Sequence, residues 1–242
     1  MCIRDRFAAP QAGREATMTH DEVTTLFHEF GHTLHHILTA QTEPQVSGIN
    51  GVEWDAVELP SQFLENFAWE HEIVKSISAH VETGEQLPDE LFDKMIAAKN
   101  YEAGAFCVRQ VEFALFDMLL HSAFDPKTDS VQALLDSVRR EVAVVFPPAW
   151  NRFPQSFSHI FAGGYGAGYY SYKWAEVLSA DCFSAFEEEG VLNPDTGRRY
   201  LKEILERGSS RDAIDNFVAF RGRKPELDPL LRLSGIIESQ KH

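Results

Sequence analysis

His28, Glu29 and His32, in the run His-Glu-Phe-Gly-His, are the residues of this chain with the clearest chemical potential. Histidines four positions apart lie on one face of a helix, so their imidazoles can bind the same tetrahedral ion, such as zinc. In a His-Glu-x-x-His helix the glutamate is not a ligand but the base that takes a proton from metal-bound water. The spacing therefore predicts a zinc site that hydrolyses peptide bonds. The alternative is a helix that carries two histidines by chance.

A catalytic zinc needs a third protein ligand and one open position for water. The three cysteines, Cys2, Cys107 and Cys182, have no spacing that suits a metal site or a disulfide framework. The stretch after the histidines offers carboxylates instead. Glu58 lies between two apolar residues, and Glu65 follows seven positions later on the same side of a helix. The residues alone leave both candidates open, and either can equally be an ordinary surface carboxylate.

A second unusual stretch spans residues 159–172, where glycines and tyrosines are concentrated. Its composition indicates a flexible loop that offers hydroxyl groups. It is a poor phosphate-binding loop, because no Lys-Ser or Lys-Thr pair follows the glycines. Ordinary helix packing is the alternative interpretation for the tyrosines at its end, which include Tyr172.

Helices are the elements expected to position these residues. Thr19 and Glu22 have the spacing of a capping box, and apolar residues recur at helical spacing after them. We therefore expect the His-Glu-x-x-His run on a helix over about residues 20–39. Asp55 is a candidate N-cap for the next helix, and Pro60 a candidate kink in its first turns. The same periodicity predicts helices at about 55–80, 89–121, 130–142, 171–189, 194–206 and 210–220.

Strand patterns are nearly absent from the chain. Almost no stretch alternates apolar and polar residues with a period of two, as a half-buried strand does. Residues 42–53 are expected to form a loop or, at most, a short β-hairpin near the site. Because 44% of the residues are hydrophobic, a packed core is also expected. The sequence thus predicts an all-α fold.

Charge and composition exclude several classes of partner. The chain of 242 residues has a net charge of −15, which argues against nucleic-acid binding because that function needs a basic face. No apolar run approaches the roughly 20 residues that span a bilayer, so no membrane segment is expected. Sparse cysteines favour a reducing compartment, and we expect a cytoplasmic protein.

Three separated motifs resemble peptidase family M3, the thimet oligopeptidase-like zinc metallopeptidases. The motifs are residues 19–36 with the His-Glu-Phe-Gly-His run, residues 54–66 with Trp-Asp-Ala-Val-Glu-Leu-Pro-Ser-Gln, and residues 157–174 with Ala-Gly-Gly-Tyr. The stretch 46–52 resembles the oligopeptidase branch more than the dipeptidyl carboxypeptidase branch. The resemblance covers the chain from about residue 7 to its C-terminus.

The resemblance implies a role for each candidate residue. Glu58 becomes the third ligand of one zinc ion per chain, and Glu65 a supporting carboxylate outside the ligand set. Tyr165 and Tyr172 are implied to donate hydrogen bonds to the oxyanion of the tetrahedral intermediate, and His159 to contact the substrate. The implied substrates are short unfolded peptides, and the implied state of the full-length protein is a monomer.

Family members are much longer than this chain, and the difference lies before residue 7. We therefore expect residues 7–242 to be the C-terminal catalytic portion of the family architecture and residues 1–6 to be a non-native leader. The part of the family architecture that precedes this portion is expected to be missing. An inactive fragment that still binds zinc, or a helical interaction module, is consequently the alternative function.

Overall fold

The computed structural model describes residues 12–13 and 17–238, and within these ranges every regular element is a helix. The prediction of an all-α fold is therefore confirmed. Residues 42–53 form a series of turns and bends rather than a β-hairpin. The predicted leader, residues 1–6, lies outside the described residues. None of the described helices is long and apolar enough to cross a membrane.

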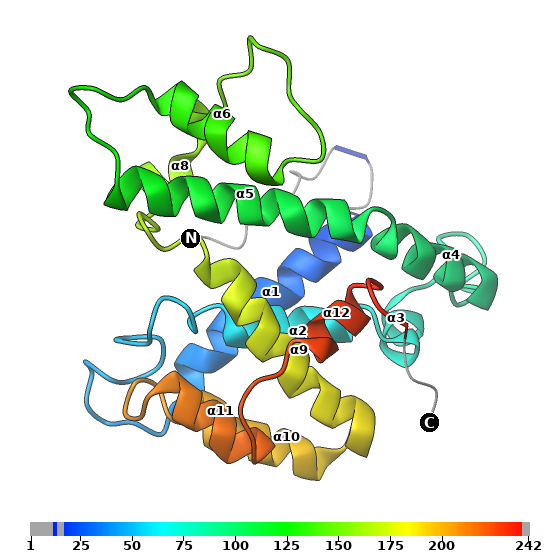
Figure 1. Ribbon diagram of the computed structural model, residues 1–242. Helices are drawn as coiled ribbons and strands as arrows, with labels where there is room; N and C mark the ends of the chain where they lie inside the picture. The colour runs from blue at the N-terminus through cyan, green and yellow to red at the C-terminus, as the bar shows by residue number, and fades with distance from the viewer. Residues whose placement is uncertain (1–11, 14–16, 239–242) are drawn as a thin grey trace.

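The helices follow one another along the chain, and the longest connection between the described helices, residues 38–58, separates the first from the second (Figure 1). They are α1 (His20–Ile37), α2 (Leu59–Phe67), α3 (His71–Ile77), α4 (Asp89–Asn100), α5 (Ala103–Ser122), α6 (Val131–Val142), α7 (Phe153–Ser156), α8 (Ser158–Phe161), α9 (Ser171–Glu189), α10 (Pro194–Tyr200), the π-helical η2 (Leu201–Leu205), α11 (Ala213–Arg221) and α12 (Asp228–Leu233). The predicted helices at 130–142 and 171–189 are confirmed within one residue. The short helices α7, α8 and α12 were not predicted.

Two predicted helices are each divided into two. The predicted helix 55–80 forms α2 and α3, which are separated by residues 68–70. Its N-cap is Glu58 and not Asp55, and Pro60 lies in the first turn, where its missing N–H costs nothing and no kink results. The predicted helix 89–121 is interrupted at Glu102, whose φ of 55° is left-handed and ends a regular helix.

The first helix begins where the capping box predicts. The Thr19 side chain accepts a hydrogen bond from the Glu22 backbone N–H, and the Glu22 carboxylate accepts one from the Thr19 N–H. These two bonds satisfy N–H groups that the first turn of a helix leaves without partners. Helix α1 therefore starts at His20 and carries both motif histidines on one face.

Helices α1 and α2 pack against each other at backbone distance. Gly31 makes this approach possible, because a Cβ atom there would lie 2.5 Å from the Pro60 carbonyl oxygen and 2.6 Å from the Ser61 Cα. No side chain fits into so small a space. The glycine of the motif thus lets the start of α2, and with it Glu58, lie beside the two histidines.

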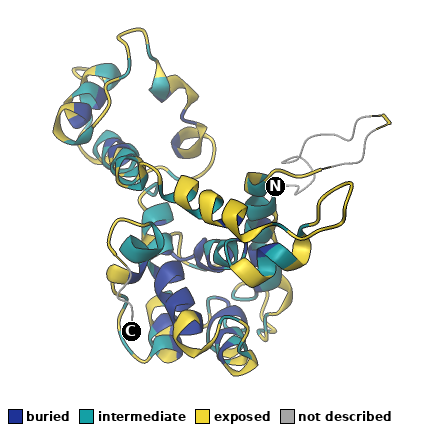
Figure 2. Cartoon of the chain, turned by 90° about the vertical axis from the view of Figure 1, so that its right-hand side faces the viewer, coloured by how far each residue is buried: buried dark blue, intermediate teal, exposed yellow. Residues whose placement is uncertain are grey.

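Two hydrophobic clusters hold the molecule together. The first lies among α2, α9, η2 and α11 and contains Phe63, Phe183 and Phe217; Figure 2 shows this concentration of buried residues in the lower body of the molecule. The second lies between α5, α6 and the short helices α7 and α8, and is centred on Phe116 and Leu135. The candidate site lies where elements from the two clusters meet.

Candidate metal centre and its cleft

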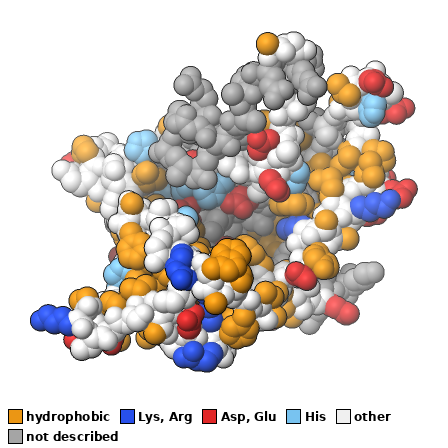
Figure 3. All heavy atoms as spheres, turned by 90° about the horizontal axis from the view of Figure 1, so that it is seen from above, with side chains coloured by type: hydrophobic (Ala, Val, Ile, Leu, Met, Phe, Trp, Pro, Cys, Tyr) orange, Lys and Arg blue, Asp and Glu red, His pale blue; other side chains and the backbone are white. Residues whose placement is uncertain are grey.

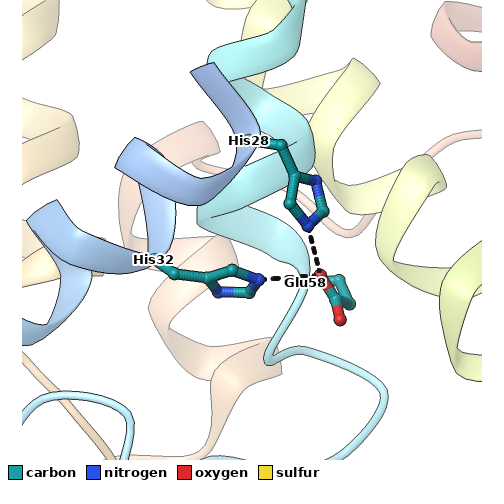
Figure 4. Close-up of side chains that lie close together, drawn as sticks. All are labelled: His28, His32 and Glu58. Carbon is teal, nitrogen blue, oxygen red and sulfur yellow. Dashed lines mark ion pairs between the residues drawn. The ribbon is translucent and has the colours of Figure 1, made fainter. Parts of the chain in front are cut away.

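His28, His32 and Glu58 converge on one point, with ligand atoms that all lie within 4.8 Å of one another. Glu58 Oε2 is 3.4 Å from His28 Nε2 and 3.1 Å from His32 Nε2 (Figure 4). Both histidines come from α1, and the glutamate comes from the N-cap of α2. Two imidazole nitrogens and one carboxylate oxygen are a donor set that suits zinc and leaves a fourth position open.

Glu65 occupies a different place from Glu58, although both contact His28. Its Oε1 atom lies 2.6 Å from His28 Nδ1, on the side of the ring away from Glu58. A hydrogen bond from Nδ1–H fixes the tautomer and the orientation of the ring, so that Nε2 faces the other ligand atoms. Burial lowers the pKa of His28, but hydrogen bonding to Glu65 and the charges of Glu65, Glu58 and Glu29 outweigh it and raise that pKa.

The Glu58 carboxylate is buried, and each of its oxygens accepts a hydrogen bond. Its Oε2 atom accepts a hydrogen bond of 2.9 Å from the Ser61 hydroxyl, and its Oε1 atom accepts one of 2.9 Å from the Tyr165 hydroxyl. Burial raises the pKa of Glu58, but hydrogen bonding and charge at His32, the charge of His28 and the Tyr165 hydroxyl together lower it to about 2. The group is therefore ionised at neutral pH, as a metal ligand must be.

The stretch 159–172, predicted to be a loop, forms the end of α8, a loop and the start of α9. Tyr165 in the loop bonds to this carboxylate, and Tyr172 in the first turn of α9 packs beside it. Tyr165 and Tyr172 stack with ring centroids 4.7 Å apart, and the Trp54 ring meets Tyr165 edge-on at 4.8 Å. His159 lies edge-on to Tyr172, with centroids 6.1 Å apart. Burial, Tyr172 and Glu58 together raise the pKa of Tyr165, so its hydroxyl remains a donor at neutral pH. All three predicted loop residues thus line one wall of the site.

The site opens into a cleft with a volume of about 810 Å³. Glu29 is buried and lines it, together with His28, His32, Glu58, His159, Tyr165 and Tyr172. Figure 3 shows histidine and carboxylate side chains gathered in a hollow of the face seen from above. The candidate ligands, Glu29 and the three residues from the 159–172 stretch therefore border the same space, whereas Glu65 lies behind His28, outside the cleft lining. A volume of this size accommodates a peptide segment.

Three of the other residues that line this cleft could contact a ligand but were not among the candidates predicted from the sequence. Tyr169 and Gln110 line it, and the Tyr169 hydroxyl donates a hydrogen bond of 3.0 Å to Gln110 Oε1. Burial and the Tyr172 and Glu176 charges raise the pKa of Tyr169 to about 12. Trp54 is the third. Gln110 lies in the middle of α5 without any local signal, whereas the exposed aromatic Trp54, just before the acidic stretch, was a signal that could have been used.

A helix with two histidines, a buried carboxylate beside them and a bordering cleft are features found in the sites of metal-dependent hydrolases. Residues 6–236 match peptidase family M3, and the chain belongs to this family. It is 58% identical to oligopeptidase A of Escherichia coli over 231 residues and 46% identical to a probable cytosolic oligopeptidase A of Arabidopsis thaliana over 233 residues. It is 35% identical to dipeptidyl carboxypeptidase of Salmonella typhimurium over 234 residues. The predicted similarity to the oligopeptidase branch is confirmed.

These alignments cover most of this chain but a minor part of each relative. They span 95% of the chain and 34% of the Escherichia coli protein, 94% and 33% for the Arabidopsis protein, and 95% and 34% for the Salmonella protein. The chain therefore spans about a third of the length of the relatives that it matches. The match over residues 6–236 establishes the family.

Proposed function

We propose that the protein to which this chain contributes is a zinc-dependent oligopeptidase that cleaves short unfolded peptides internally. The observation that carries the proposal is the convergence of His28, His32 and Glu58 beside Glu29 in one cleft. The relatives named oligopeptidase A support the choice of oligopeptides as substrates. The cytosol is the proposed location, in keeping with the name of the Arabidopsis relative and with the few cysteines.

The residues present fit a zinc ion. His28 and His32 would offer their Nε2 atoms and Glu58 a carboxylate oxygen, while Glu65 would hold the ring of His28 in place. Zinc bound there supplies a Lewis acid that polarises the scissile carbonyl and acidifies a water molecule. The hydrogen bond of Ser61 to Glu58 orients the third ligand, because it restricts the carboxylate to one rotamer.

The proposed reaction uses Glu29 as the proton carrier. Its carboxylate takes a proton from the attacking water and returns a proton to the leaving amine, which makes it first a general base and then a general acid. Its place one position after His28 on α1 directs it into the same cleft as the ligands. The peptide bond breaks and one water molecule is consumed, so no other reactant is needed.

Tyr165 and Tyr172 are proposed to stabilise the negative charge that develops on the carbonyl oxygen. The hydroxyl of Tyr165 already lies 2.9 Å from the Glu58 carboxylate, beside the ligand group where that oxygen must bind. Donors fixed in advance at such a position are worth more than donors recruited from water. His159, which lies edge-on to Tyr172 in the cleft wall, is proposed to contact the peptide.

The test is Glu29→Gln in the full-length protein that the gene encodes. We expect zinc content of one ion per chain to be retained, and hydrolysis of an internally quenched fluorescent peptide to fall at least about a hundredfold, because general-base catalysis contributes 10²–10⁴-fold. Glu43→Gln, at an exposed position outside the cleft, is the matched control and should keep full activity. Substantial turnover by Glu29→Gln would refute its role as the base.

A further inference from the structure

Asp117 of α5 is a buried carboxylate whose hydrogen bonds end on the loop that carries Tyr165. We propose that Asp117 is a positioning residue for the reaction: it fixes residues 165–169 so that the Tyr165 hydroxyl is held at the metal ligands. The inference rests on the proposed function. It adds a residue that belongs to neither the ligand group nor the cleft lining, and whose effect on the reaction passes through Tyr165.

Both oxygens of Asp117 are bonded to the backbone of that loop. Oδ1 accepts a hydrogen bond of 2.9 Å from the Ala167 N–H, and Oδ2 accepts one of 2.9 Å from the Tyr169 N–H. The imidazole of His121, one turn later on α5, lies 2.8 Å from Oδ1. The carboxylate is only 1% exposed, and a buried charge of this kind requires such partners. Its two backbone partners lie 50 and 52 residues away along the chain, so these bonds fix tertiary structure.

The loop is conformationally strained at the residue that Asp117 holds. Ala167 has a φ of 57°, in the left-handed region that residues other than glycine rarely adopt. Such conformations persist where the surrounding structure enforces them, and they cluster at functional sites. Here the hydrogen bond from the Ala167 N–H to Asp117 supplies the enforcement. Without it, the flanking glycines Gly166 and Gly168 would give the loop many other conformations.

The fixed backbone is connected directly to Tyr165. The Gly168 N–H, between the two amides that Asp117 binds, donates a hydrogen bond of 2.8 Å to the Tyr165 carbonyl oxygen. The Tyr165 hydroxyl then donates to Glu58. A continuous series of hydrogen bonds therefore runs from α5 through the turn 165–168 to the candidate third ligand.

Helix α5 is a rigid base for this connection. Phe116, the residue before Asp117, is completely buried in the second hydrophobic cluster with Leu135 and Val138. His121 adds a steric limit, because a Cβ atom on Gly166 would lie only 3.1 Å from its Nε2 atom. Helix α5 thus holds the Asp117 carboxylate in place, and His121 confines the loop at Gly166. Both contacts limit where Tyr165 can move.

A purely structural role for Asp117 is the competing explanation, and it predicts a different kind of defect. Loss of a purely structural residue has the same effect whether or not Tyr165 has its hydroxyl. Loss of a positioning residue lowers kcat only while the Tyr165 hydroxyl that it positions is present. Asp117→Asn is the suitable change because its volume is nearly the same. It keeps one acceptor oxygen and sets an amide N–H₂ against the second backbone N–H, which breaks one of the two bonds.

The experiment measures kcat and KM of the full-length protein with a quenched fluorescent peptide for Asp117→Asn, Tyr165→Phe and the double variant. Asp181→Asn is the control for loss of a buried carboxylate remote from the loop, because Asp181 is fully buried and accepts hydrogen bonds from the Glu226 N–H, Arg221 and Arg223. We expect Asp117→Asn to lower kcat about ten- to a hundredfold with KM changed less than twofold, since small misplacements of catalytic groups have effects of this size. In the Tyr165→Phe background the same change should lower kcat less than twofold.

An equal loss of kcat in both backgrounds, or a loss equal to that of Asp181→Asn, would overturn the proposal. Should Asp117→Asn fail to fold, His121→Ala replaces it and should give a smaller fall in kcat, which disappears when Tyr165→Phe is also present. A fall in kcat that remains in the Tyr165→Phe background would refute the proposal. Zinc binding without hydrolysis by the unaltered protein would refute the proposed function instead. In that case hydrogen exchange tests whether Asp117 fixes the loop. The amides of Ala167 and Tyr169 should lose protection in Asp117→Asn, and retained protection would refute the positioning role of Asp117.

Discussion

The hydrogen bond between His28 and Glu65 leads to a quantitative prediction about metal affinity. Glu65→Ala removes an acceptor that lies 2.6 Å from His28 Nδ1. A hydrogen bond to a charged group contributes about 1.5–3 kcal/mol, and the Glu65 side chain is 34% exposed, which places its contribution near the lower end, at about 1.5–2 kcal/mol. Because 1.4 kcal/mol corresponds to a tenfold change in Kd, zinc should bind about 10–30-fold more weakly.

The assay is a competition titration in which the protein and a fluorescent chelator compete for zinc at fixed pH. Glu65→Gln should give a smaller loss than Glu65→Ala, because the amide oxygen still accepts the hydrogen bond but lacks the charge. Glu72→Ala removes an exposed glutamate of the neighbouring helix α3 and serves as the control. A loss below twofold for Glu65→Ala, or a loss equal to that of the control, would refute the assignment of Glu65 as the partner that orients His28.

Three further predictions concern catalysis, packing and metal removal. Tyr165→Phe should lower kcat about a hundredfold while zinc stays bound, as the loss of one oxyanion donor does; unchanged kcat in peptide assays would contradict that role. Gly31→Ala should reduce the free energy of unfolding by about 1–3 kcal/mol in denaturant titrations, because its Cβ would meet the Pro60 carbonyl at 2.5 Å, whereas Gly104→Ala, with open space around it, should not destabilise. Removing zinc that was present at 100 times its Kd should lower the free energy of unfolding by about 2.7 kcal/mol, and an unchanged denaturation midpoint after chelation would show that no such site stabilises the fold.

The ligand group was largely predictable because its determinants are local. The capping box at Thr19 starts α1 at His20, and helical periodicity then places His28 and His32 on one face. The choice between Glu58 and Glu65 was not predictable from spacing, because both contact His28 through opposite ring nitrogens. Only their positions in space, one at the N-cap of α2 and the other on its side, separate a candidate ligand from a supporting group.

Helix boundaries were less predictable where tertiary contacts determine them. The break between α2 and α3 contains neither glycine nor proline, but Trp69 within it packs edge-on against His20 at 4.2 Å and lies under the Lys99 ammonium group. The break at Glu102 likewise has no turn signal of its own. Asp117 was invisible to sequence analysis for a related reason: it occupies an ordinary helical position, and its partners are a distant loop.

The two hydrophobic clusters bear on how the sequence of this chain can change over evolutionary time. Residues of the first cluster, such as Phe63 of α2, support the helix whose N-cap is Glu58, while the second cluster supports α5 and, through Asp117, the loop of Tyr165. On the proposed function, substitutions around Phe116 and Leu135 should alter turnover more than zinc affinity, and substitutions around Phe63 should alter zinc affinity more than the position of Tyr165. The helix capped by Glu58 and the loop of Tyr165 are thus supported by different parts of the interior, whereas Tyr172 lies on α9, which contributes Leu178 and Phe183 to the first cluster.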